Sequence, residues 1–194
     1  MKRILLVDNF DSFTYNLVHY LESHDCSVDV CYNTAIPIGV ANKYDAVVLS
    51  PGPGLPEESG DLKVFVAEFL GEIPILGVCL GMQALAVQLG GTLYNQQVVK
   101  HGVQESIITK RGVLFSQDDS EFEVGLYHSW AVSKEGDYTI TAESKNGTVM
   151  ALENKSLRCY GVQFHPESIL TPKGMEILEN FLEEVAVETP ISAE

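Results

Sequence analysis

The feature that most constrains the fold of this chain is an abrupt change of pattern around Cys79. Residues 75–78 form a short apolar run, which predicts a buried strand. From Leu80 the apolar side chains recur at helical spacing, so a helix follows directly. Cys79 therefore stands at a strand-to-helix corner between Gly77 and Gly81, whose missing Cβ atoms permit a sharp turn. This Gly-x-Cys-x-Gly pattern is the thiol counterpart of the Gly-x-Ser-x-Gly nucleophile elbow.

The position of Cys79 allows two interpretations. A thiol at a helix N-terminus lies at the positive end of the helix dipole, which favours the thiolate and therefore a nucleophile. A buried cysteine can equally be a structural residue that packs like a small hydrophobic side chain. The elbow alone does not decide between these roles, so other parts of the chain have to.

The first half of the chain alternates apolar runs with helical segments. This order predicts a parallel sheet joined by right-handed crossovers. The expected strands cover residues 3–8, 27–31, 44–50 and 75–78, and the expected helices run from a cap at Asp11 or Ser12 to about residue 22 and over 62–70. Sites in such sheets gather at the carboxyl ends of strands, so the loops after Asp8, Ser50 and Val78 should lie along one rim.

The second half of the chain has a different texture, with short apolar stretches separated by turn residues. It predicts short strands, some of them antiparallel, over residues 92–95, 105–109, 130–132, 138–142, 149–152 and 159–164. Pro172 is expected to open a last amphipathic helix whose inward face carries Met175, Leu178, Phe181 and Leu182. The predicted class is α/β, with an open, mainly parallel central sheet flanked by helices and additional short antiparallel strands in the C-terminal half.

Length and composition exclude several classes of protein. A chain of 194 residues with 45% hydrophobic residues fits one domain with a substantial core. Its apolar runs are too short for a signal peptide or a membrane span, so we expect a soluble, cytoplasmic protein without a membrane partner. The net charge of -15 argues against nucleic acid. The four cysteines are scattered, which predicts neither a disulfide framework nor a metal site.

A second cluster of chemically capable residues lies at the end of the last predicted strand, in Gly161-Val-Gln-Phe-His-Pro-Glu167. A cysteine nucleophile needs a base for its proton and an acid for the leaving group, and histidine serves as both near neutral pH. A carboxylate can orient that histidine and stabilise its imidazolium. Cys79, His165 and Glu167 supply one group of each kind. Taken alone, His165 and Glu167 are equally compatible with a strand-end histidine and a solvated glutamate.

A third element is the turn Ser50-Pro-Gly-Pro-Gly54, which follows a predicted strand. A glycine-rich turn at this place can direct backbone N–H groups toward a developing oxyanion. Such turns are also common as plain loops, so this motif is weak by itself.

Taken together, these motifs closely resemble those of the class I (triad) glutamine amidotransferases. The resemblance runs from Lys2 to about Phe181, nearly the whole chain. We expect one domain over residues 1–187, and the polar character of residues 188–194 predicts a flexible tail. It rests on Gly77-Val-Cys-Leu-Gly81, Gln83, Ser50-Pro-Gly-Pro-Gly54 and Gln163-Phe-His-Pro-Glu167. Within the family, two further segments look like the glutaminase subunits of anthranilate synthase and aminodeoxychorismate synthase: Asp8-Asn-Phe-Asp-Ser-Phe-Thr-Tyr-Asn-Leu17 and Tyr127-His-Ser-Trp130.

The resemblance implies a role for each matching residue. Cys79 would attack the side-chain carboxamide of glutamine and form a γ-glutamyl thioester, while His165, oriented by Glu167, would transfer protons. Backbone N–H groups of Gly52 and Leu80 would form the oxyanion hole. The positions that match the glutamine-binding residues of the family are Gly52, Pro53, Gly54, Gln83, Ser129 and Trp130.

The resemblance also implies a partner. Ammonia would pass to a separate chorismate-using synthase subunit, which would bind Mg²⁺, so no cofactor or metal is expected in this chain. Lys100-His-Gly102 resembles a segment near the synthase contact, and His101, Asp11 and Ser12 are the candidate interface residues. The flanks depart from the family pattern, because Lys100 stands where methionine is usual and Val103-Gln-Glu where a lysine and small hydroxyl residues are typical.

Several functions stay open at this point. The ammonia could serve anthranilate synthase in tryptophan synthesis, aminodeoxychorismate synthase in folate synthesis, or both. The fold could also belong to a non-catalytic regulatory binding protein, against which the intact Cys79, His165 and Glu167 argue. A stand-alone cysteine hydrolase fits Gln83 and residues 127–130 less well than a glutaminase does.

Overall fold

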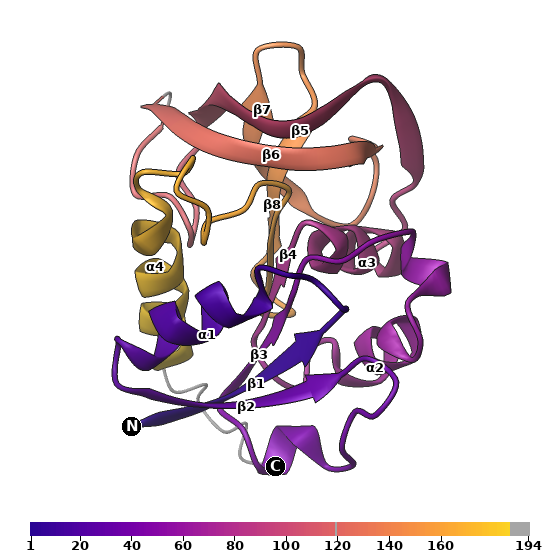
Figure 1. Cartoon of the computed structure of the whole chain (residues 1–194), viewed down its shortest axis with the longest axis vertical. Coiled ribbons are helices and arrows are strands. Elements are labelled where there is room, and N and C mark those ends of the chain that lie inside the picture. The colour runs from indigo at the N-terminus through magenta and orange to yellow at the C-terminus, as the bar shows by residue number, and fades with distance from the viewer. Residues whose placement is uncertain (119, 187–194) are drawn as a thin grey trace.

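The computed structural model describes residues 1–118 and 120–186, and within these ranges the chain forms one nine-stranded sheet with the order β2-β1-β3-β4-β9-β8-β7-β5-β6 (Figure 1). The first five strands in this order are mutually parallel. They are β2 (Cys26–Tyr32), β1 (Lys2–Asp8), β3 (Ala46–Leu49), β4 (Ile75–Val78) and β9 (Cys159–Val162). Their common direction brings the loops after β1, β3, β4 and β9 to one rim of the sheet, as the sequence predicts for the first three.

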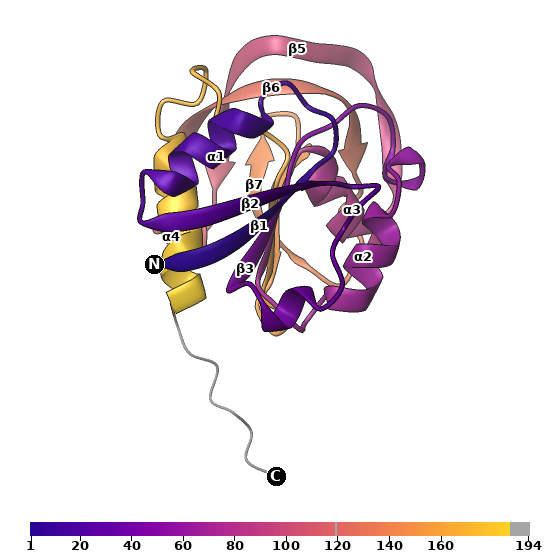
Figure 2. The ribbon, with the colours of Figure 1, turned by 60° about the horizontal axis from the view of Figure 1, so that its bottom comes forward.

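The remaining four strands are antiparallel to their neighbours. They are β8 (Val149–Asn154), β7 (Thr139–Ser144), β5 (Leu93–Thr109) and β6 (Ser120–Val132). Figures 1 and 2 both show β5 and β6 crossing the end of the sheet as a long curved ribbon. The predicted α/β class, with a mainly parallel sheet and antiparallel strands in the C-terminal half, is confirmed.

The ribbon is longer than predicted. The separate short strands expected at 92–95 and 105–109 are the two ends of one 17-residue strand, and the strand expected at 130–132 is the end of a 13-residue strand. The pairing of β5 with β6 shifts register between Asn95 and Lys100 and again between His101 and Val103. These irregularities interrupt the alternation that marks a strand, so polar residues and Gly102 look like a loop in the sequence.

Helices cover both faces of the parallel sheet. α1 (Thr14–Glu22) and α4 (Gly174–Ala186) lie on one face, and α2 (Leu62–Phe69) and α3 (Leu80–Gln88) lie on the other, with short 3₁₀ turns at Val40–Asn42 and Pro56–Glu58 (Figure 1). Alternate residues of β1 enter two separate cores, Ile4 with α1 and α4 and Leu5 with α2 and α3. Burial on both faces explains why residues 4–7 of β1 are all apolar.

The start of α1 differs from the prediction. Phe13 occupies the N-cap position without a side-chain cap, so neither Asp11 nor Ser12 caps the helix. The Asp11 carboxylate instead accepts a hydrogen bond from the Phe13 N–H at 2.8 Å and stabilises the preceding turn. The Asp8 carboxylate accepts bonds from the Asp11 N–H and the Thr14 hydroxyl. This loop is therefore tied to the end of β1.

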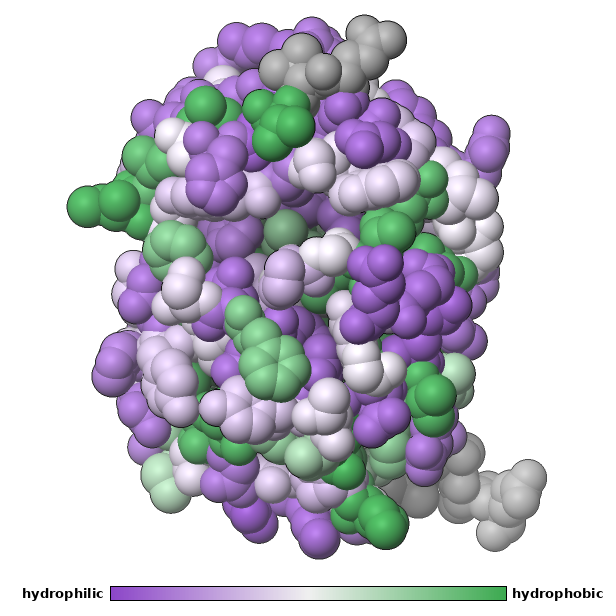
Figure 3. Space-filling model, turned by 45° about the vertical axis from the view of Figure 1, so that its right-hand side comes forward, coloured by the Kyte–Doolittle hydropathy of each residue, from purple (hydrophilic) through white to green (hydrophobic). Residues whose placement is uncertain are grey.

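The predicted last helix begins at Gly174, two residues after Pro172, and buries Leu178, Phe181 and Leu182. The predicted tail at 188–194, and the domain limit at 187, lie outside the described residues. No helix within the described ranges is long and apolar enough to cross a membrane. On the face shown in Figure 3, apolar groups are scattered among polar ones.

Candidate active site

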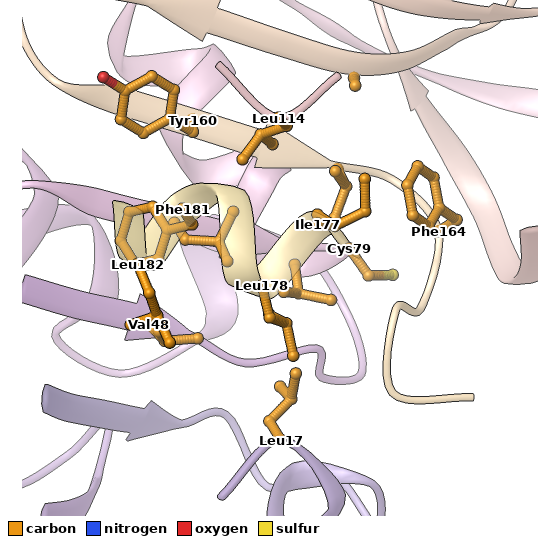
Figure 4. Close-up of a cluster of buried hydrophobic side chains, with 14 of the residues drawn as sticks. Leu17, Val48, Cys79, Leu114, Tyr160, Phe164, Ile177, Leu178, Phe181 and Leu182 are labelled. Atoms are coloured by element: carbon orange, nitrogen blue, oxygen red, sulfur yellow. The ribbon is translucent and has the colours of Figure 1, made fainter. Parts of the chain in front are cut away.

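Cys79 lies at the junction of β4 and α3 in a conformation that few residues adopt. Its φ of 52° and ψ of -103° place a non-glycine residue at positive φ, which carries backbone strain. The Cys79 N–H donates to the Val162 carbonyl at 2.8 Å, so β9 holds the strained corner in place. Cys79 is 6% exposed and closes one end of the apolar cluster beneath α1 and α4 (Figure 4).

The glycines on either side of Cys79 are required by contact distances. A Cβ atom on Gly77 would lie 2.5 Å from the backbone carbon of Gly81. A Cβ atom on Gly81 would lie 2.5 Å from the backbone oxygen of Leu49 in β3. Both neighbours are backbone atoms and cannot rotate away. The Gly-x-Cys-x-Gly pattern therefore follows from the close packing of the α3 N-terminus on the sheet.

His165 and Glu167 lie in the loop after β9, on the same rim as Cys79. The His165 Nδ1–H donates to Glu167 Oε1 at 2.6 Å, and both residues are 2% exposed. The His165 backbone is held at both polar groups, since its N–H donates to the Gly125 carbonyl and its carbonyl accepts from the Thr171 hydroxyl. Glu167 is thus buried against His165, and the alternative of a solvated glutamate is wrong.

The surroundings of His165 favour its protonated form. Burial opposes the charge, but the Cys79 thiol and the Glu167 carboxylate outweigh burial and raise the pKa of His165 above its ordinary value. Its Nε2 is buried and makes no hydrogen bond to nitrogen or oxygen within residues 1–118 and 120–186. An imidazolium fixed by a carboxylate next to a thiol is an arrangement that can hold a thiolate and later return a proton.

The glycine-rich turn after β3 packs directly against the elbow. A Cβ atom on Gly52 would lie 2.6 Å from Asn9 and 2.8 Å from the Leu80 side chain. The Asn9 N–H donates to the Ser50 hydroxyl at 2.8 Å, which ties the loops after β1 and β3 together. Leu80 is the first residue of α3, so its N–H has no acceptor within the helix. The structure thus brings Gly52 and Leu80 together.

Two cavities meet at Cys79. The smaller, of about 160 Å³, contains the residues predicted to bind glutamine, and its lining is Gly52, Pro53, Gly54, Cys79, Gln83, Tyr127, His128, Ser129 and Trp130. The larger, of about 430 Å³, contains the candidate interface residues, and its lining is Phe10, Asp11, Ser12, Phe13, Pro51, Gly52, Pro53, Cys79, His101, Tyr127 and His165. The two cavities share Gly52, Pro53, Cys79 and Tyr127, so they adjoin at the thiol.

The structure also reveals contacts around the site that the motifs alone do not predict. The ring of Tyr127 meets that of His165 edge to face at a centroid distance of 4.8 Å, and Phe13 does so at 5.9 Å. Tyr127 and Ser168 share a hydrogen bond at 3.0 Å. Gln163 donates to the Cys79 sulfur at 3.5 Å. The only signal for these residues is their position inside or next to the recognised motifs.

Comparison with known proteins decides the family. The profile described as glutamine amidotransferase class-I matches residues 5–185. The chain belongs to this family. As a class-I glutamine amidotransferase, it shares its overall fold with a glutamine amidotransferase from Thermotoga maritima, whose crystal structure superposes with a TM-score of 0.79 at 17% identity, over 96% of this chain and 99% of that one.

Two sequence relatives are closer to this amidotransferase. A Lactococcus lactis protein named anthranilate synthase component 2 is 42% identical over 188 residues, which cover 94% of each chain. A Bacillus subtilis protein named aminodeoxychorismate/anthranilate synthase component 2 is 40% identical over 185 residues, which cover 93% of this chain and 95% of the relative. Within the described part of the amidotransferase, no group of three His, Cys, Asp or Glu side chains could hold a metal ion.

Proposed function

We propose that this chain is the glutaminase subunit of anthranilate synthase, acting in the cytoplasm on glutamine. The observation that carries the proposal is the convergence of Cys79, His165 and Glu167 at the carboxyl ends of two adjacent parallel strands. A thiol on a strained backbone, a histidine with a raised pKa and a buried carboxylate form the set that nucleophilic hydrolysis of an amide requires. The names of both relatives point to the same subunit.

In the proposed reaction, the Cys79 thiolate attacks the side-chain carbonyl carbon of glutamine. The negative charge that develops on the carbonyl oxygen is stabilised by the N–H groups of Gly52 and Leu80. The carbon–nitrogen bond then breaks, and the His165 imidazolium gives its proton to the leaving nitrogen, so ammonia departs and a γ-glutamyl thioester remains. Neutral His165 next takes a proton from water, which attacks the thioester and releases glutamate. Glu167 stabilises the imidazolium in both halves.

The smaller cavity is the proposed binding site for glutamine. Its residues from the turn, the helix and the ribbon surround a space that leads to the thiol from one side. Gln83, Ser129 and Trp130 offer polar groups and a ring edge for the amino-acid end of the substrate. The larger cavity adjoins the smaller one at Cys79 and is also lined by the loop after β1 and by His101. It provides the proposed exit for ammonia.

The proposed partner is a chorismate-using synthase subunit that docks over this exit. Asp11, Ser12 and His101 line the larger cavity and would lie at the contact. The Mg²⁺ needed for chorismate chemistry would belong to that subunit, and this chain would work without a cofactor. A second acceptor, aminodeoxychorismate synthase, is supported by the Bacillus relative, whose name includes both syntheses.

The deciding experiment measures glutamate release from glutamine with and without an anthranilate synthase large subunit and chorismate. We expect strong stimulation by the partner, with anthranilate formed in step. Cys79→Ser should abolish glutamate release while the protein stays folded. Release that responds only to an aminodeoxychorismate synthase subunit would move the acceptor to that pathway. A folded protein that never releases glutamate would refute the proposal and favour a regulatory binding protein.

A further inference from the structure

Gln163 is a buried polar residue that contacts the reactive sulfur and has no part in the mechanism described above. It is the first residue after β9 and is completely buried. Its backbone N–H donates to the Met150 carbonyl at 2.8 Å, which fixes its main chain. Its side-chain Nε2 lies 3.5 Å from Cys79 Sγ. A fully buried amide is retained only where its hydrogen bonds are made, so this contact calls for an explanation.

The orientation of the Gln163 amide follows from a chain of hydrogen bonds that begins at the ribbon. The Trp130 carbonyl can only accept, so the Gln83 side chain must present its Nε2 there, at 3.2 Å. The same Nε2 lies 3.1 Å from Gln163, which must therefore offer its Oε1. The remaining Nε2 of Gln163 then faces sulfur as a donor. A backbone carbonyl thus sets the polarity of the contact with Cys79.

We propose that Gln163 is a positioning residue that donates a hydrogen bond to the Cys79 sulfur, stabilises the thiolate and aims it at the carboxamide carbon of the substrate. The inference rests on the proposed glutaminase function. A sulfur anion is a stronger acceptor than a thiol, so the bond strengthens when Cys79 ionises. Gln163 directly follows the last residue of β9, and His165 stands two residues further along the chain.

The same chain of bonds leaves one side-chain atom of Gln83, a residue predicted to bind glutamine, available to the substrate. Its Nε2 serves both Gln163 and Trp130, so its Oε1 remains available as an acceptor. Gln83 lines the smaller cavity, where that oxygen suits the α-ammonium group of an amino acid. Binding of substrate at Gln83 would therefore steady the residue that holds Gln163. The Trp130–Gln83–Gln163–Cys79 chain links the substrate cavity to the nucleophile.

The test is the pH dependence of alkylation of Cys79 by iodoacetamide in the free protein, with the modified peptide quantified by mass spectrometry. Burial raises the pKa of the other three thiols: that of Cys31 rises to about 11, that of Cys159 to about 12, and that of Cys26 also rises. These thiols therefore react slowly near neutral pH. No variant replaces a titratable group around the sulfur. These groups are His165, Glu167, Asp11, His101, Tyr127 and His128.

Gln163→Met keeps the length of the side chain and removes the donor. We expect the alkylation midpoint to rise by about one pH unit, so that alkylation below the midpoint slows about tenfold. With partner and chorismate present, kcat should fall more than KM changes. Gln104→Met is the matched control, because the Gln104 side chain lies on the exposed ribbon and donates to the Leu170 carbonyl instead of to Cys79. Its midpoint should equal that of the wild type.

Gln163→Leu removes the donor with an apolar side chain of a different shape, so its midpoint should rise about as far. If both Gln163 variants fold and keep the wild-type midpoint, the inference is refuted. A rise in Gln163→Met without one in Gln163→Leu would also refute it, because both variants lack the donor and the effect would then follow shape rather than donation. Failure of the proposed function looks different: the wild type would then release no glutamate whatever the alkylation profiles show.

Discussion

The substitution Gly81→Ala tests whether close backbone packing builds the nucleophile elbow. The new Cβ would lie 2.5 Å from the Leu49 carbonyl oxygen, whereas ordinary van der Waals contact begins at 3.4 Å, so α3 and β3 must separate by roughly 0.9 Å. Both contacting groups are main chain, and the shift must be absorbed by the corner that carries Cys79 and Leu80. Displacements of about 1 Å at a reacting centre can lower the rate about 100-fold.

The effect on stability is worked out separately from the effect on catalysis. Alanine in place of glycine within a helix favours folding by about 1 kcal/mol, whereas forcing extra volume into a packed core costs about 1–3 kcal/mol. We therefore expect Gly81→Ala to fold with a small net loss of stability and a loss of about 100-fold in kcat/KM. The free energy of unfolding comes from urea denaturation, and kcat/KM from partner-stimulated glutamate release.

Gly90→Ala provides the matched control at the other end of the same helix. Gly90 has a φ of 86° and nothing within 4 Å of an added Cβ, so alanine there causes only backbone strain of about 1–2 kcal/mol. This variant should be destabilised like Gly81→Ala and keep its activity. If Gly81→Ala is as active as the wild type, or if Gly90→Ala loses as much activity, the packing argument for the elbow fails.

Three further predictions concern the surroundings of His165 and the ribbon. Glu167→Gln removes a group that raises the pKa of His165, so the alkaline limb of the kcat/KM profile should move to lower pH, and an unmoved limb would contradict the pairing. Burial lowers the pKa of His128 from 6.5 to about 4. The unfolded chain therefore binds more protons between these values, and stability should fall by up to about 3 kcal/mol as pH drops through this window. His128→Met should flatten that slope in urea titrations at several pH values. Thr171→Val leaves the Gly125 N–H without its partner and removes one of the two hydrogen bonds to the His165 carbonyl, which keeps the bond from the Ser168 N–H, and should cost about 2 kcal/mol in denaturation experiments; a neutral result would show that water replaces the hydroxyl.

The parts of the fold that sequence patterns predicted are those whose determinants lie close together along the chain. The apolar run before Cys79, the two glycines and the helix are consecutive, so their pattern alone defines the elbow. His165 and Glu167 are separated by one residue, and their mutual contact follows a strand end. The parallel strands are buried on both faces and therefore lack the polar alternation that makes half-exposed strands ambiguous.

The parts that escaped prediction depend on contacts between distant segments. The ribbon pairs β5 with β6 through two register shifts around His101, and neither its length nor its path over the rim is encoded in a local pattern. The contact between Gln163 and Cys79 spans 84 positions in the chain. At α1 the expected cap failed because the Asp11 carboxylate bonds to the Phe13 N–H in the turn before the helix. A short polar side chain can bond either to a backbone group of a turn or to an N–H at the start of a helix.

This division has a functional consequence. The reactive groups stand on the parallel sheet, where main-chain packing at Gly52, Gly77 and Gly81 leaves little freedom. Residues 127–130 of the proposed substrate cavity come from the ribbon, whose pairing shifts register beside them. The two parts meet where Gln83 bonds to the Trp130 carbonyl. Because that bond uses main chain on the ribbon side, the orientation of the bonds leading to Cys79 does not depend on which side chain stands at position 130.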